Sequence, residues 1–178
     1  MQQAIAGSSN YFAGGVYAKE TGIPADLVSN LDGSAQLKAP PTRAQIMALQ
    51  EAMIPIQCPM PEAVHHFAKG MYVREFSMPA GMLVVGKIHK HQHMMMVLKG
   101  RATVGTDEGM QEVSAGYICV SPPGAKRVVL AHEDTTFATV HLNPEDSQDL
   151  EAIEAEHIEP ESPEMIALMN KYRQEALS

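Results

Sequence analysis

The sequence predicts a mainly β protein in which one small antiparallel β-barrel carries an N-terminal arm and C-terminal helices. Three observations predict this fold class. The chain has 178 residues, enough for one well-buried domain with extensions. Short runs rich in β-branched and apolar residues follow one another from residue 72 to residue 142, separated by turn residues. After Asn143 and Pro144 the apolar pattern becomes helical.

Residues 1–60 are interpreted as an arm, because glycine and proline residues interrupt any sustained periodicity. One helix is expected inside it. Thr42 can cap its N-terminus, and Ile46, Leu49 and Met53 then recur at helical spacing. This apolar face either packs on the domain or docks on another protein.

Residues 61–143 are expected to form the barrel, because turn signals recur about every eight to ten residues. His65 and His66, just before the first predicted strand, are expected at the surface, and Met94–Met96 are expected to line the barrel. Strands are predicted at residues 72–78, 82–89, 94–98, 102–106, 111–113, 117–121, 127–131 and 136–142.

Residues 144–178 are expected to form two helices on the surface, or an element for dimerisation or partner binding. This segment has ten acidic and two basic residues, so it carries the whole net charge of −8. The predicted apolar stripes are Leu150, Ile153 and His157 on the first helix and Ile166, Met169 and Tyr172 on the second.

The charge and hydropathy of the chain restrict its partners. A net charge of −8 argues against nucleic acid as a partner. No apolar run approaches the ~20 residues of a membrane-spanning helix, and the N-terminus has no export signal. We therefore expect a cytoplasmic protein without a membrane partner, and a homo-oligomer.

Histidines cluster at the end of a predicted strand, in His89-Lys90-His91-Gln92-His93. Side chains two residues apart share one face of a strand, so the three rings can point into one cavity. In a straight strand His89 and His93 would be about 13 Å apart. A shared metal therefore requires a turn or bulge near Lys90–Gln92. Imidazole suits Fe, Zn, Ni and Mn among other ions, so the ligands alone do not choose the metal.

The spacing around this cluster resembles the first motif of the cupin superfamily, whose fold is a double-stranded β-helix. Gly100, after Val97-Leu98-Lys99, is similar to the glycine that ends the motif. Counting back, His93 takes the position of the family's glutamate, His89 that of its second histidine, and Lys87 that of its first. The resemblance implies a cupin-type barrel with two of four metal ligands in place.

The second cupin motif is similar to residues 116–124, which contain Gly116 and the run Pro122-Pro123-Gly124. Arg127 stands at its histidine position. His141 or His132 would then complete the metal site with His89 and His93, with His91 as a further alternate. The amino-acid sequence around both motifs also resembles that of small uncharacterised cupin-like proteins of tailed bacteriophages.

Two functions of different class follow from this resemblance. In the first, the barrel holds a divalent metal and acts as an enzyme or binder for a small anionic molecule. Arg127 would bind the anion or pair with an acid such as Glu75, and Tyr117 or His91 would move a proton. In the second, the protein is a non-catalytic structural or interaction protein, associated with a virion if it is phage-encoded, and the barrel is a scaffold.

Overall fold

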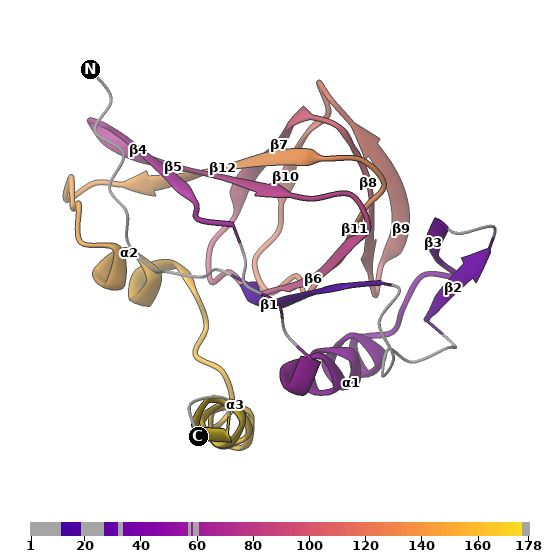
Figure 1. Cartoon of the computed structure of the whole chain (residues 1–178). Coiled ribbons are helices and arrows are strands. Elements are labelled where there is room, and N and C mark those ends of the chain that lie inside the picture. Colours follow the sequence, from indigo (N-terminus) through magenta and orange to yellow (C-terminus); the bar gives the residue numbers. More distant parts are fainter. Residues whose placement is uncertain (1–11, 19–26, 32–33, 57, 59–60, 176–178) are drawn as a thin grey trace.

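Two five-stranded antiparallel sheets face each other in the computed structural model, which describes residues 12–18, 27–31, 34–56, 58 and 61–175 (Figure 1). Sheet I contains, in spatial order, β1 (Phe12–Tyr17), β6 (Met82–Gly86), β11 (Val128–Ala131), β8 (Arg101–Thr106) and β9 (Gly109–Ser114). Sheet II contains β10 (Ile118–Ser121), β7 (His93–Lys99), β12 (Thr135–Asn143), β5 (Gly70–Met78) and β4 (Val64–Ala68). A core of apolar side chains from both sheets, including Phe76, Val97 and Val129, fills the space between them.

The order of the strands defines the fold. The eight strands from β5 to β12 are divided equally between the sheets. Sheet I contains β6, β8, β9 and β11, and sheet II contains β5, β7, β10 and β12. Every pairing is antiparallel. Two interlocked Greek keys of this kind form a jelly roll, the double-stranded β-helix. The predicted fold class is confirmed, and all eight predicted strands are present with ends shifted by a few residues.

The arm, residues 1–60, contains three strands that sequence analysis did not predict. β1 adds to the edge of sheet I beside β6, with an irregular register between Phe12 and Gly15. β2 (Val28–Leu31) and β3 (Ser34–Leu37) form a separate two-stranded sheet. The glycines within β1 hide its alternating pattern, and partners far along the chain decide its pairing. The division into residues 1–60, 61–143 and 144–178 stays a prediction.

Helix α1 (Arg43–Met53) begins as predicted at Thr42. The Thr42 hydroxyl accepts a hydrogen bond from the Gln45 backbone N–H at 3.3 Å, and the Gln45 side chain accepts one from the Thr42 N–H at 2.9 Å. This capping box satisfies two N–H groups at the helix start. The short 3₁₀ helix η1 (Ile54–Ile56) follows and contains Pro55.

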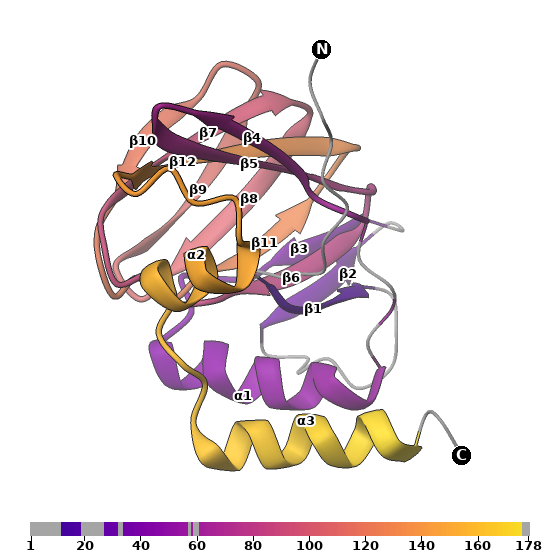
Figure 2. The same ribbon diagram turned by 90° about the vertical axis from the view of Figure 1, so that its left-hand side faces the viewer.

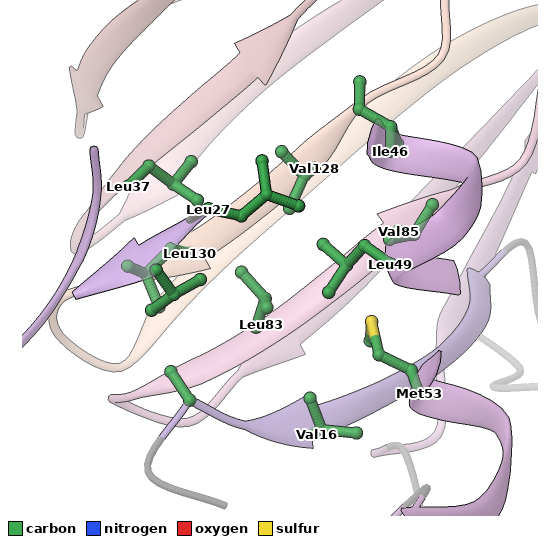
Figure 3. Packing of buried hydrophobic residues seen from close by; sticks show 12 residues of the cluster. Val16, Leu27, Leu37, Ile46, Leu49, Met53, Leu83, Val85, Val128 and Leu130 are labelled. Carbon is green, nitrogen blue, oxygen red and sulfur yellow. The ribbon is translucent and has the colours of Figure 1, made fainter. Parts of the chain in front are cut away.

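The apolar face of α1 covers sheet I (Figure 3). Ile46 and Leu49 are fully buried, and they pack with Leu83 and Leu130 on the outer side of the sheet. Burying a side chain of this size contributes roughly 1.5–3 kcal/mol as an upper estimate. Sheet I therefore has apolar side chains and packing partners on both faces.

Two helices follow the last strand. α2 (Leu150–His157) begins at Asp149, whose carboxylate accepts hydrogen bonds from two backbone N–H groups. It buries Leu150, Ile153 and His157, so its predicted stripe is confirmed. Leu150 and Ile153 pack with Tyr72 of β5.

Helix α3 (Pro163–Glu175) lies beside α1 (Figure 2). Its predicted stripe is wrong in one position, because Met165 is buried while Ile166 is exposed. Helix α3 packs against η1, next to α1. No helix in the described part of the chain is both long and apolar enough to cross a membrane.

Gly100 should be the most costly turn glycine to replace. It has φ +80°, and a Cβ atom there would lie 2.4 Å from the backbone oxygen of Asp134. Gly81 has the same φ of +80° with nothing within 4 Å of its Cβ position, which makes it a matched control. We expect Gly100→Ala to lower the free energy of unfolding by about 1–3 kcal/mol more than Gly81→Ala, measured by urea titration. Equal losses would contradict the close approach.

Candidate metal centre

Three histidines converge at one end of the space between the sheets, two from one segment of the chain and the third from a distant strand. His93 is the first residue of β7, His141 lies on the neighbouring strand β12, and His89 lies in the connection between β6 and β7. Each offers a ring nitrogen, and these nitrogens lie within 4.8 Å of one another. In the described part of the chain no other group of histidine, cysteine and acidic residues meets that criterion.

A bend brings His89 to His93. β6 ends at Gly86, the chain bends at Lys90 and His91, and β7 begins at His93. The ring centroids of His89 and His93 are 4.0 Å apart, far less than a straight strand would allow. The turn that the metal hypothesis requires is therefore present.

The backbone of the bend is held by two other segments. The Gly124 N–H donates to the carbonyl of His89 at 2.9 Å. On the other side His89 forms an isolated antiparallel bridge with Ile158, just after α2, and the Lys90 N–H donates to the carbonyl of His157 at 2.8 Å. Residues 157–158, from the segment after the last strand, thus help to position a histidine of the site.

Side chains add to this attachment. Lys87, at the position of the family's first histidine, forms an ion pair with Glu154 of α2. Both side chains are mostly buried, with 17% and 25% of their surface exposed. Lys90 donates from its ammonium to the carbonyl of Ala155 at 2.6 Å. Lys87 therefore attaches α2 to the segment between β6 and β7. Its ammonium group does not take the place of a metal-binding histidine.

Burial keeps the three imidazoles neutral. It is the main cause that lowers the pKa of His89 to about 2, with the neighbouring His93 and His141 as further causes. Burial likewise lowers the pKa of His141 to about 3 and that of His93 to about 4. Metal binding requires neutral imidazole, so the protein holds these residues in the ligating state at neutral pH.

Contacts behind the rings set their orientation. His93 Nδ1 lies 3.4 Å from the carbonyl oxygen of His91, which can only accept, so this nitrogen carries the proton and Nε2 keeps its lone pair. Tyr72 stacks on His141 with centroids 5.8 Å apart, and the Tyr72 hydroxyl is 2.8 Å from His65 Nδ1.

The surface position predicted for His65 is wrong. Only 2% of this residue is exposed, because β4 pairs with β5 and turns His65 towards Tyr72. His66 points the other way and lies 3.3 Å from a carboxylate oxygen of Glu75. Glu75 is therefore directed away from Arg127 and is not its partner.

The donor set fits a divalent transition metal. Nitrogen ligands lie about 2.0–2.1 Å from such an ion, which places nitrogens on one ion about 3–4 Å apart. Small side-chain movements would bring ring nitrogens within 4.8 Å to that spacing. A buried set of three imidazoles that leaves further coordination positions open is typical of catalytic and ligand-binding metal sites.

A small cavity of about 50 Å³ is lined by His89, His93, Lys87 and two arginines. Arg127 donates to the Ser121 hydroxyl, and burial lowers its pKa. Arg74 is only 3% exposed, and its guanidinium lies 5.0 Å from the centre of the Phe76 ring. No acidic residue lines this cavity.

Two larger cavities lie nearby. One of about 320 Å³ lies towards β9 and β10, shares Arg127 and Met95 with the small cavity, and is also lined by Tyr117. Burial is the main cause that raises the pKa of Tyr117. The other, of about 590 Å³, lies between β12 and α2 and is lined by His141, His157 and His91.

The remaining predicted residues lie outside the three-histidine cluster. His132 contacts the Thr103 hydroxyl at 2.7 Å on sheet I. His91 is exposed and lies 3.5 Å from a Glu156 carboxylate oxygen. Sequence analysis did not connect His157 with the site, although its ring centroid is 5.0 Å from that of His141. The sequence feature that could have indicated a role for His157 is its position within the apolar stripe of a predicted helix.

Comparisons with known proteins found only distant structural similarity. A scan against protein-family models found no match, and neither did a search of curated proteins. A cupin-2 domain containing protein from Shewanella frigidimarina is 11% identical, with a TM-score of 0.41, 49% of this chain covered and 86% of its own. A predicted oxalate decarboxylase from Thermotoga maritima is 18% identical, with a TM-score of 0.40 and coverage of 46% and 80%. A putative ethanolamine utilization protein from Salmonella typhimurium is 14% identical, with a TM-score of 0.40 and coverage of 46% and 68%.

The metal-free protein should lose stability as the pH falls below about 6.5. The folded-state pKa values of His89, His93 and His141 lie below the ordinary histidine value of 6.5, so the unfolded chain binds more protons under acid conditions. We expect a loss of roughly 1–2 kcal/mol for each histidine between pH 7 and pH 5, measured by urea unfolding in chelator. His93→Gln should flatten the slope. An identical slope in this variant would contradict the assignment.

Proposed function

We propose that this protein binds one divalent metal ion through His89, His93 and His141, and a small organic anion beside it. The observation that carries the proposal is the convergence of three buried imidazoles, all neutral at physiological pH, with ring nitrogens within 4.8 Å. Neutral imidazoles gathered in this way can direct their ring nitrogens at one ion, which is what a three-histidine metal site requires.

The charges around the cluster favour an anion as the second ligand. Arg127, Arg74 and Lys87 all line the small cavity, so the charged side chains of its lining are cationic. A guanidinium holds a carboxylate or phosphate through two parallel hydrogen bonds. The small cavity of about 50 Å³ has room for little more than the charged group.

The body of the ligand would occupy the cavity of about 320 Å³ that Arg127 also lines. This volume is at the lower end of the range for small-molecule sites, which suits an organic acid of a few carbon atoms. Tyr117 lines the same cavity, and its hydroxyl donates to Gln111 at 3.0 Å. Tyr117 is therefore a better candidate than His91 for moving a proton on a ligand held by Arg127.

A bound metal would act as a Lewis acid that polarises an oxygen of the ligand. Arg127 would orient the anion, and the apolar residues Met95, Phe76 and Phe137 would exclude water around it. Proton transfer by Tyr117 would make the protein an enzyme, whereas metal and anion binding alone would make it a small-molecule binder.

The second candidate function is a non-catalytic structural or interaction protein, including a component of a phage particle. One observation favours it, the broad apolar surface on the outer face of sheet II, where Ile118 and Leu142 are exposed. This surface and the histidine cluster are separate features, so metal binding and association are tested separately.

Metal binding should raise the thermal stability of the native protein by mass action. At a free metal concentration about 100 times the dissociation constant we expect about 2.7 kcal/mol, or roughly 5–10 °C in the melting temperature. Zn²⁺, Ni²⁺, Mn²⁺ and Fe²⁺ would be compared with chelator in differential scanning calorimetry. His93→Ala and His141→Ala should abolish the shift.

The matched control is His132→Ala, which removes a histidine of the same barrel outside the cluster. This variant should keep the full metal-induced shift. The metal site is wrong if no ion stabilises the parent protein, or if all three variants respond to the ions alike.

Anion binding should depend on the shape of the Arg127 side chain as well as its charge. Lysine keeps the charge but offers no planar pair of donors, so Arg127→Lys should weaken binding about tenfold or more. Isothermal titration with mono- and dicarboxylates of two to six carbons measures this. Arg101→Lys, at an exposed ion pair on the surface, is the control. No binding by the parent protein, or equal binding by Arg127→Lys, would exclude the anion site.

A further inference from the structure

The outer faces of the two sheets differ in how the chain covers them. On sheet I the outward side chains Leu83, Val85, Val128 and Leu130 are 0–1% exposed. Helix α1 covers them directly (Figure 3). An apolar outer face on this sheet is thus explained by an element of the same chain.

The outer face of sheet II is also largely apolar, with polar side chains at Glu75, Ser77 and Thr136. The strand registers place Val120 of β10 opposite Met94 of β7, Met94 opposite Val140 of β12, and Val140 opposite Val73 of β5. These side chains form one apolar row across four strands. The row ends at His66 on β4, which is opposite Val73.

Neighbouring rows continue this surface, which we call the open face. In the described part of the chain ten large hydrophobic residues are exposed, and seven of them lie here. They are Val64, Met71, Met94, Leu98, Ile118, Val120 and Leu142. Sequence analysis expected Met94 inside the barrel, but Met95 alone of the three methionines is buried, because side chains alternate along β7.

No helix or strand among the described residues covers the open face. Helices α1 and α3 lie on the side of sheet I (Figure 2). Helix α2 packs on Tyr72, which points to the opposite side of β5 from Met71 and Val73. Monomeric proteins rarely expose a continuous apolar patch of more than a few hundred Å².

We propose that the open face is the interface of a homodimer, in which two copies pack sheet II against sheet II about a two-fold axis. An apolar face is complementary to itself, as a two-fold interface requires. The rows carry one acidic residue, Glu75, which is paired with His66. The acidic residues that give the chain its net charge lie mostly in residues 144–178, so little like-charge repulsion would oppose this packing.

The size of the open face approaches that of a stable interface. Five strands about 4.8 Å apart span roughly 20–24 Å, and the nine-residue strands β5 and β12 are about 30 Å long. With shorter strands at the edges the flat area is on the order of 500 Å². Because the side chains project from the sheet, the solvent-accessible area is larger than the flat area. It approaches the ~800 Å² that each partner buries in a standard interface.

Dimerisation would also restrain the strands of the metal centre on their outer side. His93 and His141 point inward from β7 and β12, while the adjacent residues Met94 and Leu142 point outward into the open face. A partner sheet packed on these residues would restrain both strands. The dimer itself does not rest on metal binding, and its failure would leave the proposed function untouched.

Sedimentation equilibrium of the full chain tests the proposal. The parent protein should sediment at twice the chain mass of 19.3 kDa. Ile118→Lys and Met71→Lys, at separate places on the open face, should each weaken the dimer about 100-fold, because each change buries two unpaired ammonium groups in the interface. Met110→Lys is the matched control, an exposed methionine on β9 of sheet I, and should leave the dimer intact.

Circular dichroism melts would establish that the variants are folded, which is expected because both side chains are exposed in one copy. Ile118→Thr and Met71→Gln provide milder changes and should weaken the dimer in the same direction. A monomeric parent protein at about 100 µM would overturn the proposal. So would a dimer that Ile118→Lys and Met71→Lys leave intact, or one that Met110→Lys weakens equally.

Discussion

The candidate centre depends on the bend between β6 and β7, because without it His89 and His93 would lie too far apart to share a ligand. The bend has no regular pairing of its own. It is held by Gly124 on one side and by Ile158 and His157 on the other. Loops close to a metal or substrate are often positioned by a rigid scaffold in this way. Residues after the last strand are therefore part of the site, although they lie outside the double-stranded β-helix.

A second constraint is the balance of charge inside the barrel. Burial depresses the pKa values of the three histidines, and the two arginines nearby oppose any further positive charge. A cation bound to neutral imidazoles would add to that positive field. A small anion next to the metal would offset it, so metal and anion are expected to bind more tightly together than either does alone.

Much of the fold could be predicted from the sequence, because alternating residues and turn signals are local. The strands from β5 to β12 and the Thr42 cap follow from such patterns. The roles of β1 and β4 could not be predicted, since both are chosen by partners elsewhere in the chain. Among the site residues, the spacing of His89 and His93 is visible in the sequence, whereas His141 is brought beside them only by the pairing of β12 with β7. Arg74 gave no local signal, because a charged residue in a strand is usually at the surface. His157 was visible only as a histidine in the apolar stripe of α2, and nothing local connected it with the cluster.

The central claim is that His89, His93 and His141 bind one metal ion together. X-ray absorption of the zinc-loaded protein tests it directly, because imidazole ligands give a nitrogen shell at about 2.0–2.1 Å and characteristic outer-shell scattering from the ring. The account predicts three imidazoles on each zinc ion, falling to two in His141→Ala. A spectrum with fewer than three imidazoles in the parent protein, or one that does not change in His141→Ala, would contradict it.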